Sequence, residues 1–256
     1  MCDKCSDSLH LESHHQDIAP SRRSAMLFGV AAFGMAVGGG AFAGAAYAKD
    51  AKAPPKPENV LSPDASLKRL MDGNSRYVSG VSRRHDFKHE REALAGGQNP
   101  FAAVLSCADS RIAPEYAFDT GRGDLFVCRV AGNFAGTETI ASMEYAVAVL
   151  NTPLILVLGH DACGAVDATL KSIKDDKPLP GHIPSLVEAI APAAKAAMQQ
   201  GGDVLNKAIR QNVIDNIAKL KTAAPILNAA AEQGKLKVVG GIYRLTTGAV
   251  DLIAQG

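Results

Sequence analysis

The sequence has 256 residues, of which 47% are hydrophobic and 21% are charged, and it contains five cysteines. This composition excludes a disordered, collagen-like or disulfide-stabilised chain. The 27 basic and 26 acidic residues nearly balance, which gives no indication of a nucleic-acid partner or an anionic membrane surface. The length suits one large domain or two small ones.

Residues 1–48 have the features of an export signal. Arg22-Arg23 precede an uncharged, apolar stretch over residues 25–48 that ends in Ala46-Tyr47-Ala48. A charged segment, an apolar segment and an A-x-A end are the parts of a cleaved signal, and the paired arginines resemble a twin-arginine signal. We therefore expect residues 1–48 to be a twin-arginine-like signal peptide and the protein to be periplasmic or otherwise exported. Retention of the apolar stretch as a membrane anchor is the alternative, and cleavage would leave no stable membrane insertion.

The same leader contains a pattern that is typical of metal sites. Cys2-x-x-Cys5 is followed by three histidines, His10, His14 and His15. Because this pattern precedes the export motif, we favour a removed leader over a metal-binding role.

A proline-rich stretch separates the leader from the first predicted helix. Residues 49–62 are expected to form an extended linker, since proline disfavours helix in the residue before it. A helix is predicted from Pro63, with an apolar face and an end near Gly73-Asn74 or near Gly80. The charged stretch from residue 85 to 91 is predicted to be a solvated loop, with His85 and His89 on the surface.

Continuous apolar runs predict the strands of a sheet. They lie at residues 101–106, 125–130, 154–158 and 236–239, and runs of this length are typical of buried parallel strands. Apolar residues at helical spacing predict helices over residues 137–150 and 205–220. Strands alternating with helices favour an α/β fold with a mainly parallel β-sheet flanked by helices.

Two polar clusters follow predicted strands. The first is residues 106–111, Ser-Cys-Ala-Asp-Ser-Arg, and the second is residues 159–164, Gly-His-Asp-Ala-Cys-Gly. Ligands of open α/β sheets bind beyond the carboxyl ends of the strands. We therefore expect both clusters at one edge of the sheet, with one strand and its helix between them in the chain.

Cys107, His160 and Cys163 are the candidate metal ligands. Two thiolates and an imidazole suit tetrahedral Zn²⁺, and three protein ligands leave the fourth position open for water, as in catalytic zinc sites. The alternatives are a reactive or redox thiol site, or a Cys107 that is simply buried. Cys128 lies in mid-strand and is expected to be a small buried core residue.

Asp109 and Arg111 form the second informative pair. A carboxylate two residues beyond a metal thiolate can reach the metal or its water, and an arginine two residues further can hold that carboxylate with paired hydrogen bonds. A structural ion pair that fixes the loop is the alternative interpretation.

These motifs resemble those of the β-class carbonic anhydrases. The resemblance rests on residues 107–111 and 160–164 and extends over about residues 63–252, where further matching segments lie at residues 73–77, 131–133, 142–146, 241–243 and 247–248. It implies a catalytic domain over residues 63–256, with a parallel-sheet α/β fold, bound Zn²⁺, and reversible hydration of CO2 to bicarbonate and a proton by attack of zinc-bound hydroxide.

The resemblance also implies roles for individual residues. Cys107, His160 and Cys163 would bind zinc, and Asp109 and Arg111 would form the catalytic dyad. In some members the aspartate is itself the fourth zinc ligand, which makes Asp109 a further metal-ligand candidate. Members assemble as homodimers or homotetramers, so the same is expected here.

Two other functions are compatible with these motifs. One is hydrolysis of CS2 or COS on the same fold, and the other is a non-catalytic protein with a structural zinc. The Asp109–Arg111 pair disfavours the second, because a structural zinc does not need it. For the proton shuttle, His85, His89 and His182 are candidates only by elimination.

Overall fold

The structure is a computed structural model that describes residues 55–255 of the chain. The predicted signal peptide, the Cys2–His15 pattern and the first part of the predicted linker lie outside these residues. Among the helices of residues 55–255, none has the length and apolar character required to span a membrane.

A five-stranded sheet forms the centre of the described domain, in the order β2-β1-β3-β4-β5. Four strands are parallel, namely β1 (Ala102–Ser106), β2 (Leu125–Arg129), β3 (Leu154–His160) and β4 (Lys237–Tyr243). The last strand, β5 (Val250–Gln255), is antiparallel to β4. The predicted α/β fold with a mainly parallel sheet is therefore confirmed.

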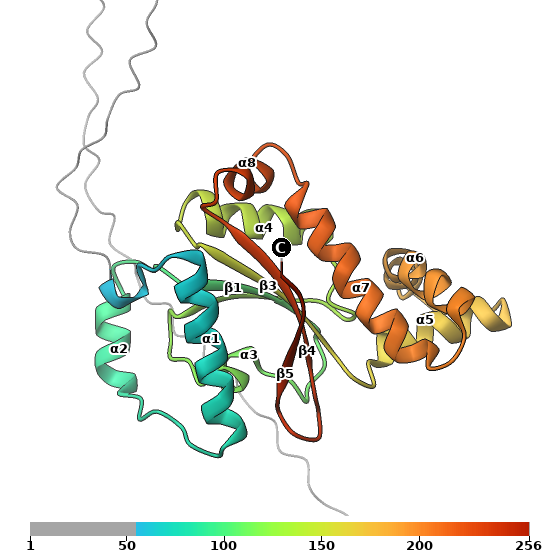
Figure 1. Cartoon of the computed structure of the whole chain (residues 1–256), viewed down its shortest axis with the longest axis horizontal. Helices are drawn as coiled ribbons and strands as arrows, with labels where there is room; N and C mark the ends of the chain where they lie inside the picture. Colours follow the sequence, from blue (N-terminus) through green and yellow to red (C-terminus); the bar gives the residue numbers. More distant parts are fainter. Residues whose placement is uncertain (1–54, 256) are drawn as a thin grey trace, which may run out of the picture. The chain divides into compact units, whose positions relative to one another are not determined.

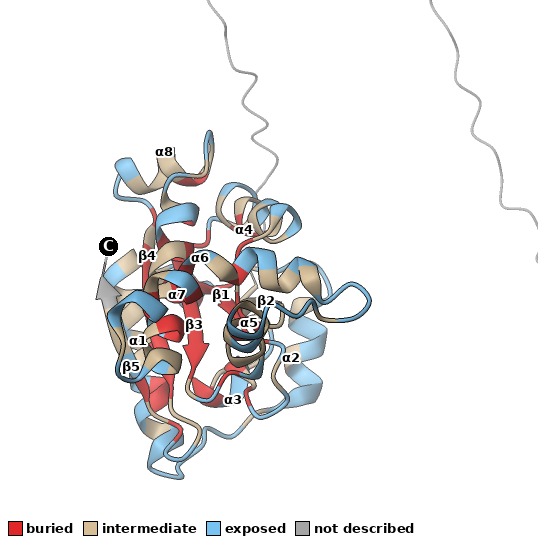
Figure 2. Cartoon of the chain, turned by 90° about the vertical axis from the view of Figure 1, so that its right-hand side faces the viewer, coloured by how far each residue is buried: buried red, intermediate tan, exposed pale blue. Residues whose placement is uncertain are grey.

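Helices cover both faces of the sheet (Figure 1). They are α1 (Pro63–Val78), α2 (Phe87–Leu94), α3 (Pro114–Ala117), α4 (Thr137–Ala148), α5 (Gly164–Asp175), α6 (Pro184–Gln200), α7 (Val204–Lys221) and α8 (Leu227–Glu232), with a turn of 3-10 helix at Pro57–Asn59. Successive strand residues alternate between two apolar cores, one formed with α1 and α3 and the other with α4 to α8. In Figure 2 the buried residues concentrate on the central strands β1, β3 and β4.

Helix α1 begins and ends for identifiable local reasons. The Ser62 hydroxyl accepts a hydrogen bond from the Ala65 N–H, and Pro63 occupies the first turn, as predicted. The helix ends at Val78, which agrees with the later of the two predicted ends. Gly73 lies inside the helix because α1 packs closely there against Phe118, the residue after α3. A Cβ on Gly73 would lie 1.9 Å from the carbonyl oxygen of Phe118.

The prediction of a loop over residues 85–91 is wrong for most of its length, because Phe87–Leu94 is helical. Asp86 caps this helix by accepting a hydrogen bond from the His89 N–H at 3.2 Å. His89 is exposed, as predicted, but His85 is half-buried and its ring stacks on Phe87. The helix escaped prediction because it is short and mostly charged, with Phe87 and Leu94 as its only large apolar side chains.

Three further details differ from the predictions. Strand β2 is half-buried rather than buried, because it lies at the edge of the sheet. Strand β5 was not predicted, and β3 continues through Gly159 to His160. In the part of the predicted linker that the structure describes, residues 55–62, Pro57–Asn59 form a 3-10 turn, and the buried Asn59 donates to Asp124 at 3.1 Å.

Candidate metal centre

The topology brings the two predicted clusters together. β1 and β3 are adjacent parallel strands, with Ser106 opposite Leu158. Cys107 directly follows β1, His160 is the last residue of β3, and Cys163 is the N-cap of α5. The intervening chain forms β2 and α4, as the spacing predicts. The expectation of one shared edge is confirmed.

The three candidate ligands converge at this edge. One donor atom from each of Cys107, His160 and Cys163 lies within 4.8 Å of the other two. All three residues are buried, and the two sulfurs are 4.0 Å apart with no disulfide between them. Two sulfurs and one imidazole nitrogen at this separation fit the donor set of a tetrahedral metal site.

The imidazole of His160 is oriented for metal binding. Its Nδ1 lies 2.8 Å from the carbonyl oxygen of Asp161, so Nδ1 carries the proton and Nε2 has a free lone pair. Nε2 is buried and has no hydrogen-bond partner. A buried polar atom without a partner is costly unless a ligand satisfies it, and a metal ion held with Cys107 and Cys163 would do so here.

The turn after β3 brings Cys163 back toward His160. Ala162 adopts φ +50°, a left-handed conformation that alanine rarely adopts. Asp161 fixes this turn to the end of β4, because its N–H donates to the Tyr243 carbonyl at 3.2 Å and its Oδ1 accepts from the Leu245 N–H at 3.0 Å. The turn is therefore held from both sides.

The electrostatics of the two thiols also fit a cation. A hydrogen bond from Cys163, together with the one from the Gly132 N–H, lowers the pKa of Cys107 to about 4. The same hydrogen bond to Cys107, together with burial, raises the pKa of Cys163. Two thiolates so close repel each other strongly, and a divalent cation between them removes that repulsion.

Asp109 and Arg111 form the paired hydrogen bonds that the sequence predicts. Arg111 Nε lies 2.9 Å from Asp109 Oδ1, and Nη2 lies 2.7 Å from Oδ2. The side-chain hydrogen bonds from Arg111 keep the pKa of Asp109 well below its usual range. Asp109 Oδ2 lies 3.8 Å from His160 Nε2, so the carboxylate borders the three donors. Asp109 is not itself in the converging set, and both of its oxygens are engaged by Arg111.

Sequence reasoning missed Arg129, at the end of β2. Its Nε donates to the Cys107 carbonyl at 2.9 Å and its Nη2 donates to the Asp109 carbonyl at 2.6 Å. One side chain thus fixes the backbone on both sides of Ala108. A charged residue that closes an otherwise apolar strand was the signal that could have identified it.

The remaining cysteine and histidine candidates lie outside the converging set. Cys128 is half-buried in β2, and burial raises the pKa of its thiol. His89 and His182 are exposed, and His85 lies 3.4 Å from Glu90. Within residues 55–255, Cys107, His160 and Cys163 form the one group of at least three such donors close enough to share a metal ion.

Comparison with known proteins gives consistent matches. Residues 102–250 match the carbonic anhydrase family model. Carbonic anhydrase 2 of Mycobacterium tuberculosis is 39% identical over 188 residues, which are 73% of this chain and 91% of that protein. The carbonic anhydrase of Mycolicibacterium smegmatis is 38% identical over 192 residues, which are 75% of this chain and 93% of that protein.

The solved structures that are similar to this chain include β-carbonic anhydrases. The β-carbonic anhydrase CcaA is 27% identical with a TM-score of 0.58, over 74% of this chain and 92% of that chain. The Coccomyxa β-carbonic anhydrase is 28% identical with a TM-score of 0.57, over 79% of this chain and 87% of that chain. With the convergent cysteines and histidine, these matches show that the chain belongs to the β-class carbonic anhydrase family and is a carbonic anhydrase.

Proposed function

We propose that the ion held by Cys107, His160 and Cys163 is Zn²⁺ and that this site hydrates CO2 reversibly to bicarbonate and a proton. The supporting observation is the convergence of two buried sulfurs and an unpartnered imidazole nitrogen within 4.8 Å of one another. Sulfur and nitrogen donors favour zinc over magnesium or calcium, which prefer oxygen. When bound, zinc supplies a Lewis acid that lowers the pKa of water toward neutrality.

The protein's own groups then orient the reaction. Asp109 borders the donors through Oδ2 and accepts a hydrogen bond from the reacting water, which aims a lone pair of that water at CO2. Arg111 keeps Asp109 ionised and fixed in position. In this arrangement Asp109 acts with Arg111, and service as a fourth metal ligand would require the carboxylate to give up hydrogen bonds to Arg111.

Stopped-flow CO2 hydration by the zinc-loaded protein tests this function. We expect activity that depends on zinc between pH 7 and 9, and Asp109→Asn should keep the metal but lower turnover roughly 100-fold or more. CS2 and COS are assayed in parallel, because a hydrolase on the same fold would act on them instead. Zinc binding without hydration of CO2 would indicate a structural site and would refute the proposal.

We further propose that the chain assembles as a homodimer or homotetramer. Crystal structures describe two tetrameric β-carbonic anhydrases from Sordaria macrospora, 23% identical to this chain with a TM-score of 0.59. Strand β2 is an edge strand, and Tyr145, whose ring lies near that of Phe126 in β2, is exposed. Unpaired edges with exposed aromatic neighbours favour association. Light scattering after size exclusion should give a mass at least twice that of the chain, and a monomer at micromolar concentration would contradict this.

We also propose that residues 1–48 are a cleaved twin-arginine-like signal and that the enzyme is exported. The support is the sequence itself, namely Arg22-Arg23, the uncharged stretch and the Ala46-Tyr47-Ala48 end. Cell fractionation and N-terminal sequencing test it. The expected result is mature protein outside the cytoplasm, beginning near Lys49, and uncleaved precursor confined to the cytoplasm would contradict it.

A further inference from the structure

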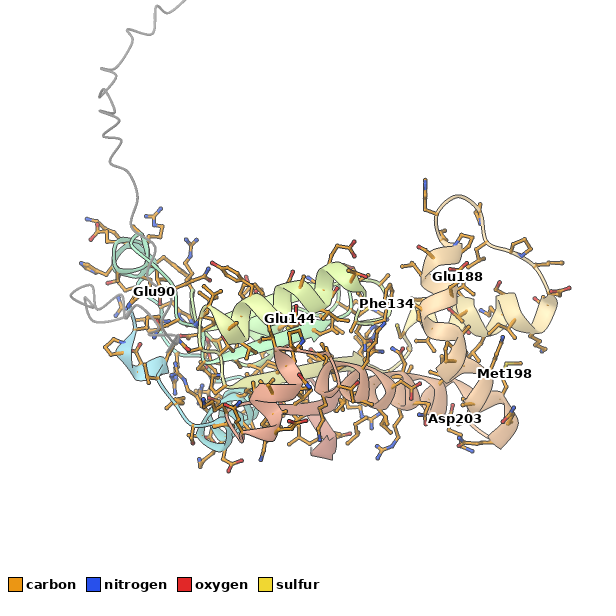
Figure 3. All side chains as sticks on the ribbon, turned by 90° about the horizontal axis from the view of Figure 1, so that it is seen from above. Glu90, Phe134, Glu144, Glu188, Met198 and Asp203 are labelled. Carbon is orange, nitrogen blue, oxygen red and sulfur yellow. The ribbon has the colours of Figure 1, made fainter. Side chains whose placement is uncertain are left out.

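A tight loop after β2 contacts one of the metal-site sulfurs. The backbone N–H of Gly132 donates to Cys107 Sγ at 3.3 Å. Gly132 adopts φ +85°, and a Cβ there would lie 2.4 Å from Cδ1 of Ile190, so glycine is required for both conformation and space. In Figure 3 this loop can be located by the label on Phe134, two residues further along the chain. The direction of the Gly132 N–H is thus set by an unusual backbone conformation.

Helix α7 holds the carbonyl group of Gly132. Asn212 donates through Nδ2 to the Gly132 carbonyl at 2.8 Å. Asn216, one helical turn later, accepts from the Ala135 N–H at 2.7 Å and donates to the Asn212 backbone carbonyl at 2.7 Å and to its Oδ1 at 3.2 Å. The two amides therefore form a ladder along α7 that fixes both ends of the loop.

This ladder is buried and fully bonded. Asn212 is 2% exposed and Asn216 is 5% exposed, next to the apolar Val213 and Ile217 of the same helix. Burying polar amides is unfavourable unless each finds partners, and here each amide bonds both to the loop and to the other amide. α7 is itself held close to the sheet, because a Cβ on Gly240 would lie 2.6 Å from Val213 and 2.5 Å from Ile217. The loop is thus attached to a rigid support.

An N–H hydrogen bond to a thiolate changes what that sulfur donates to a metal. The donor withdraws electron density from the sulfur, which lowers the energy of its lone pairs and preserves the Lewis acidity of the metal. Such bonds depend strongly on direction, so the group that fixes the donor controls the effect.

We propose that Asn212 is a positioning residue of the metal site. It holds Gly132 so that the N–H points at Cys107 Sγ, and it thereby limits the charge that this sulfur gives to the bound metal. This inference rests on the proposed metal binding by Cys107.

Cobalt substitution tests this role directly. The full chain is prepared as the native protein and as Asn212→Leu, which has a similar volume but no amide, and both are loaded with Co²⁺. We expect the sulfur-to-cobalt charge-transfer band of Asn212→Leu to move to longer wavelength, because the sulfur lone pairs rise in energy.

Leu220→Ala is the matched control. Leu220 is buried in the same helix, so this variant should lower the melting temperature without moving the band. If Asn212→Leu does not fold, Asn212→Ser, whose side chain is too short to reach Gly132, is measured instead. An unmoved band in a folded, cobalt-loaded Asn212 variant would overturn the inference. A native protein that binds no cobalt would contradict the proposed metal site instead, so the two failures are distinguishable.

Discussion

Arg111 engages both carboxylate oxygens of Asp109, at 2.9 and 2.7 Å, and the second of these oxygens lies 3.8 Å from His160 Nε2. Nη2 of Arg111 also lies 3.3 Å from the Ala162 carbonyl oxygen, in the turn that leads to Cys163. A single guanidinium therefore joins the loop after β1 to the turn after β3. The carboxylate is aligned with the metal donors through this connection.

Arg111→Lys should reduce activity without removing the metal. Lysine keeps the positive charge but cannot make two parallel hydrogen bonds to a carboxylate, so Asp109 loses its fixed orientation. We expect kcat/KM for CO2 hydration to fall about 100-fold, the scale expected for a misplaced reacting group. Stopped-flow kinetics and metal analysis on the same sample measure both quantities. Arg84→Lys, at an exposed arginine, is the control, and unchanged activity in Arg111→Lys would contradict the dyad.

Cys107→Ser should abolish stoichiometric zinc binding. A serine hydroxyl remains protonated at neutral pH and is a much weaker zinc ligand than a thiolate. Metal analysis after dialysis against a mild chelator is the measurement. Cys128→Ser is the matched control, because Cys128 is a half-buried thiol outside the converging donors, and it should retain zinc. Equal zinc contents in the two variants would exclude Cys107 as a ligand.

Asp119→Asn should change how stability depends on pH. Burial opposes ionisation of Asp119, but hydrogen bonds from Arg76, the Arg83 N–H and Ser82 outweigh it and lower the pKa of this carboxyl. Because the folded-state pKa lies below the unfolded value of about 3.9, the ionised group stabilises the fold above that pH, and this contribution is lost as the pH falls through the folded pKa. Asparagine tolerates the positive φ of this position, so the substitution mainly removes charge.

Urea unfolding at several pH values measures this effect. At pH 7 the variant should be less stable by about 2 kcal/mol, a magnitude typical of lost hydrogen bonds to a charged group. The difference should shrink below about pH 4, where the unfolded carboxyl takes up a proton while the native one is still ionised, and the charge contribution is lost once the pH falls below the folded pKa. Asp72→Asn, which removes only the exposed pair with Lys68, should cost less than about 1 kcal/mol. A difference that is constant from pH 7 to pH 3 would contradict the assignment.

Gly73→Ala should destabilise the domain although alanine is the better helix former. The new methyl group would lie 1.9 Å from the Phe118 carbonyl oxygen, a backbone atom that cannot move without displacing the segment after α3. We expect a loss of about 1–3 kcal/mol in the free energy of unfolding, as for other overpacked sites. Gly96→Ala, where a Cβ has no neighbour within 4 Å, should change stability by less than about 0.5 kcal/mol. Equal stabilities of the two variants would show that α1 shifts freely.

The sequence was informative where a local pattern carries the structure. Apolar runs indicated β1, β3 and β4, and the polar residues that follow β1 and β3 indicated the metal centre, because parallel strands end at a common edge. α2 was missed since it is short, mostly charged and has only two large apolar residues. The edge position of β2 depends on strand order, which no local pattern records. The hydrogen bond between Asn212 and Gly132 joins residues that are 80 positions apart. Its trace in the sequence is a pair of asparagines one turn apart, next to the apolar Ile209, Val213 and Ile217 of the same helix.

The contacts that close the turn at Asp161 reach to Tyr243 and to Leu245, which lies 84 residues further along the chain. During synthesis on a ribosome, Cys107 and Cys163 therefore emerge long before the segments that fix them in place. We expect a nascent chain to retain an ion poorly until nearly the whole domain has been translated, so that cofactor insertion is a late event in the maturation of this enzyme.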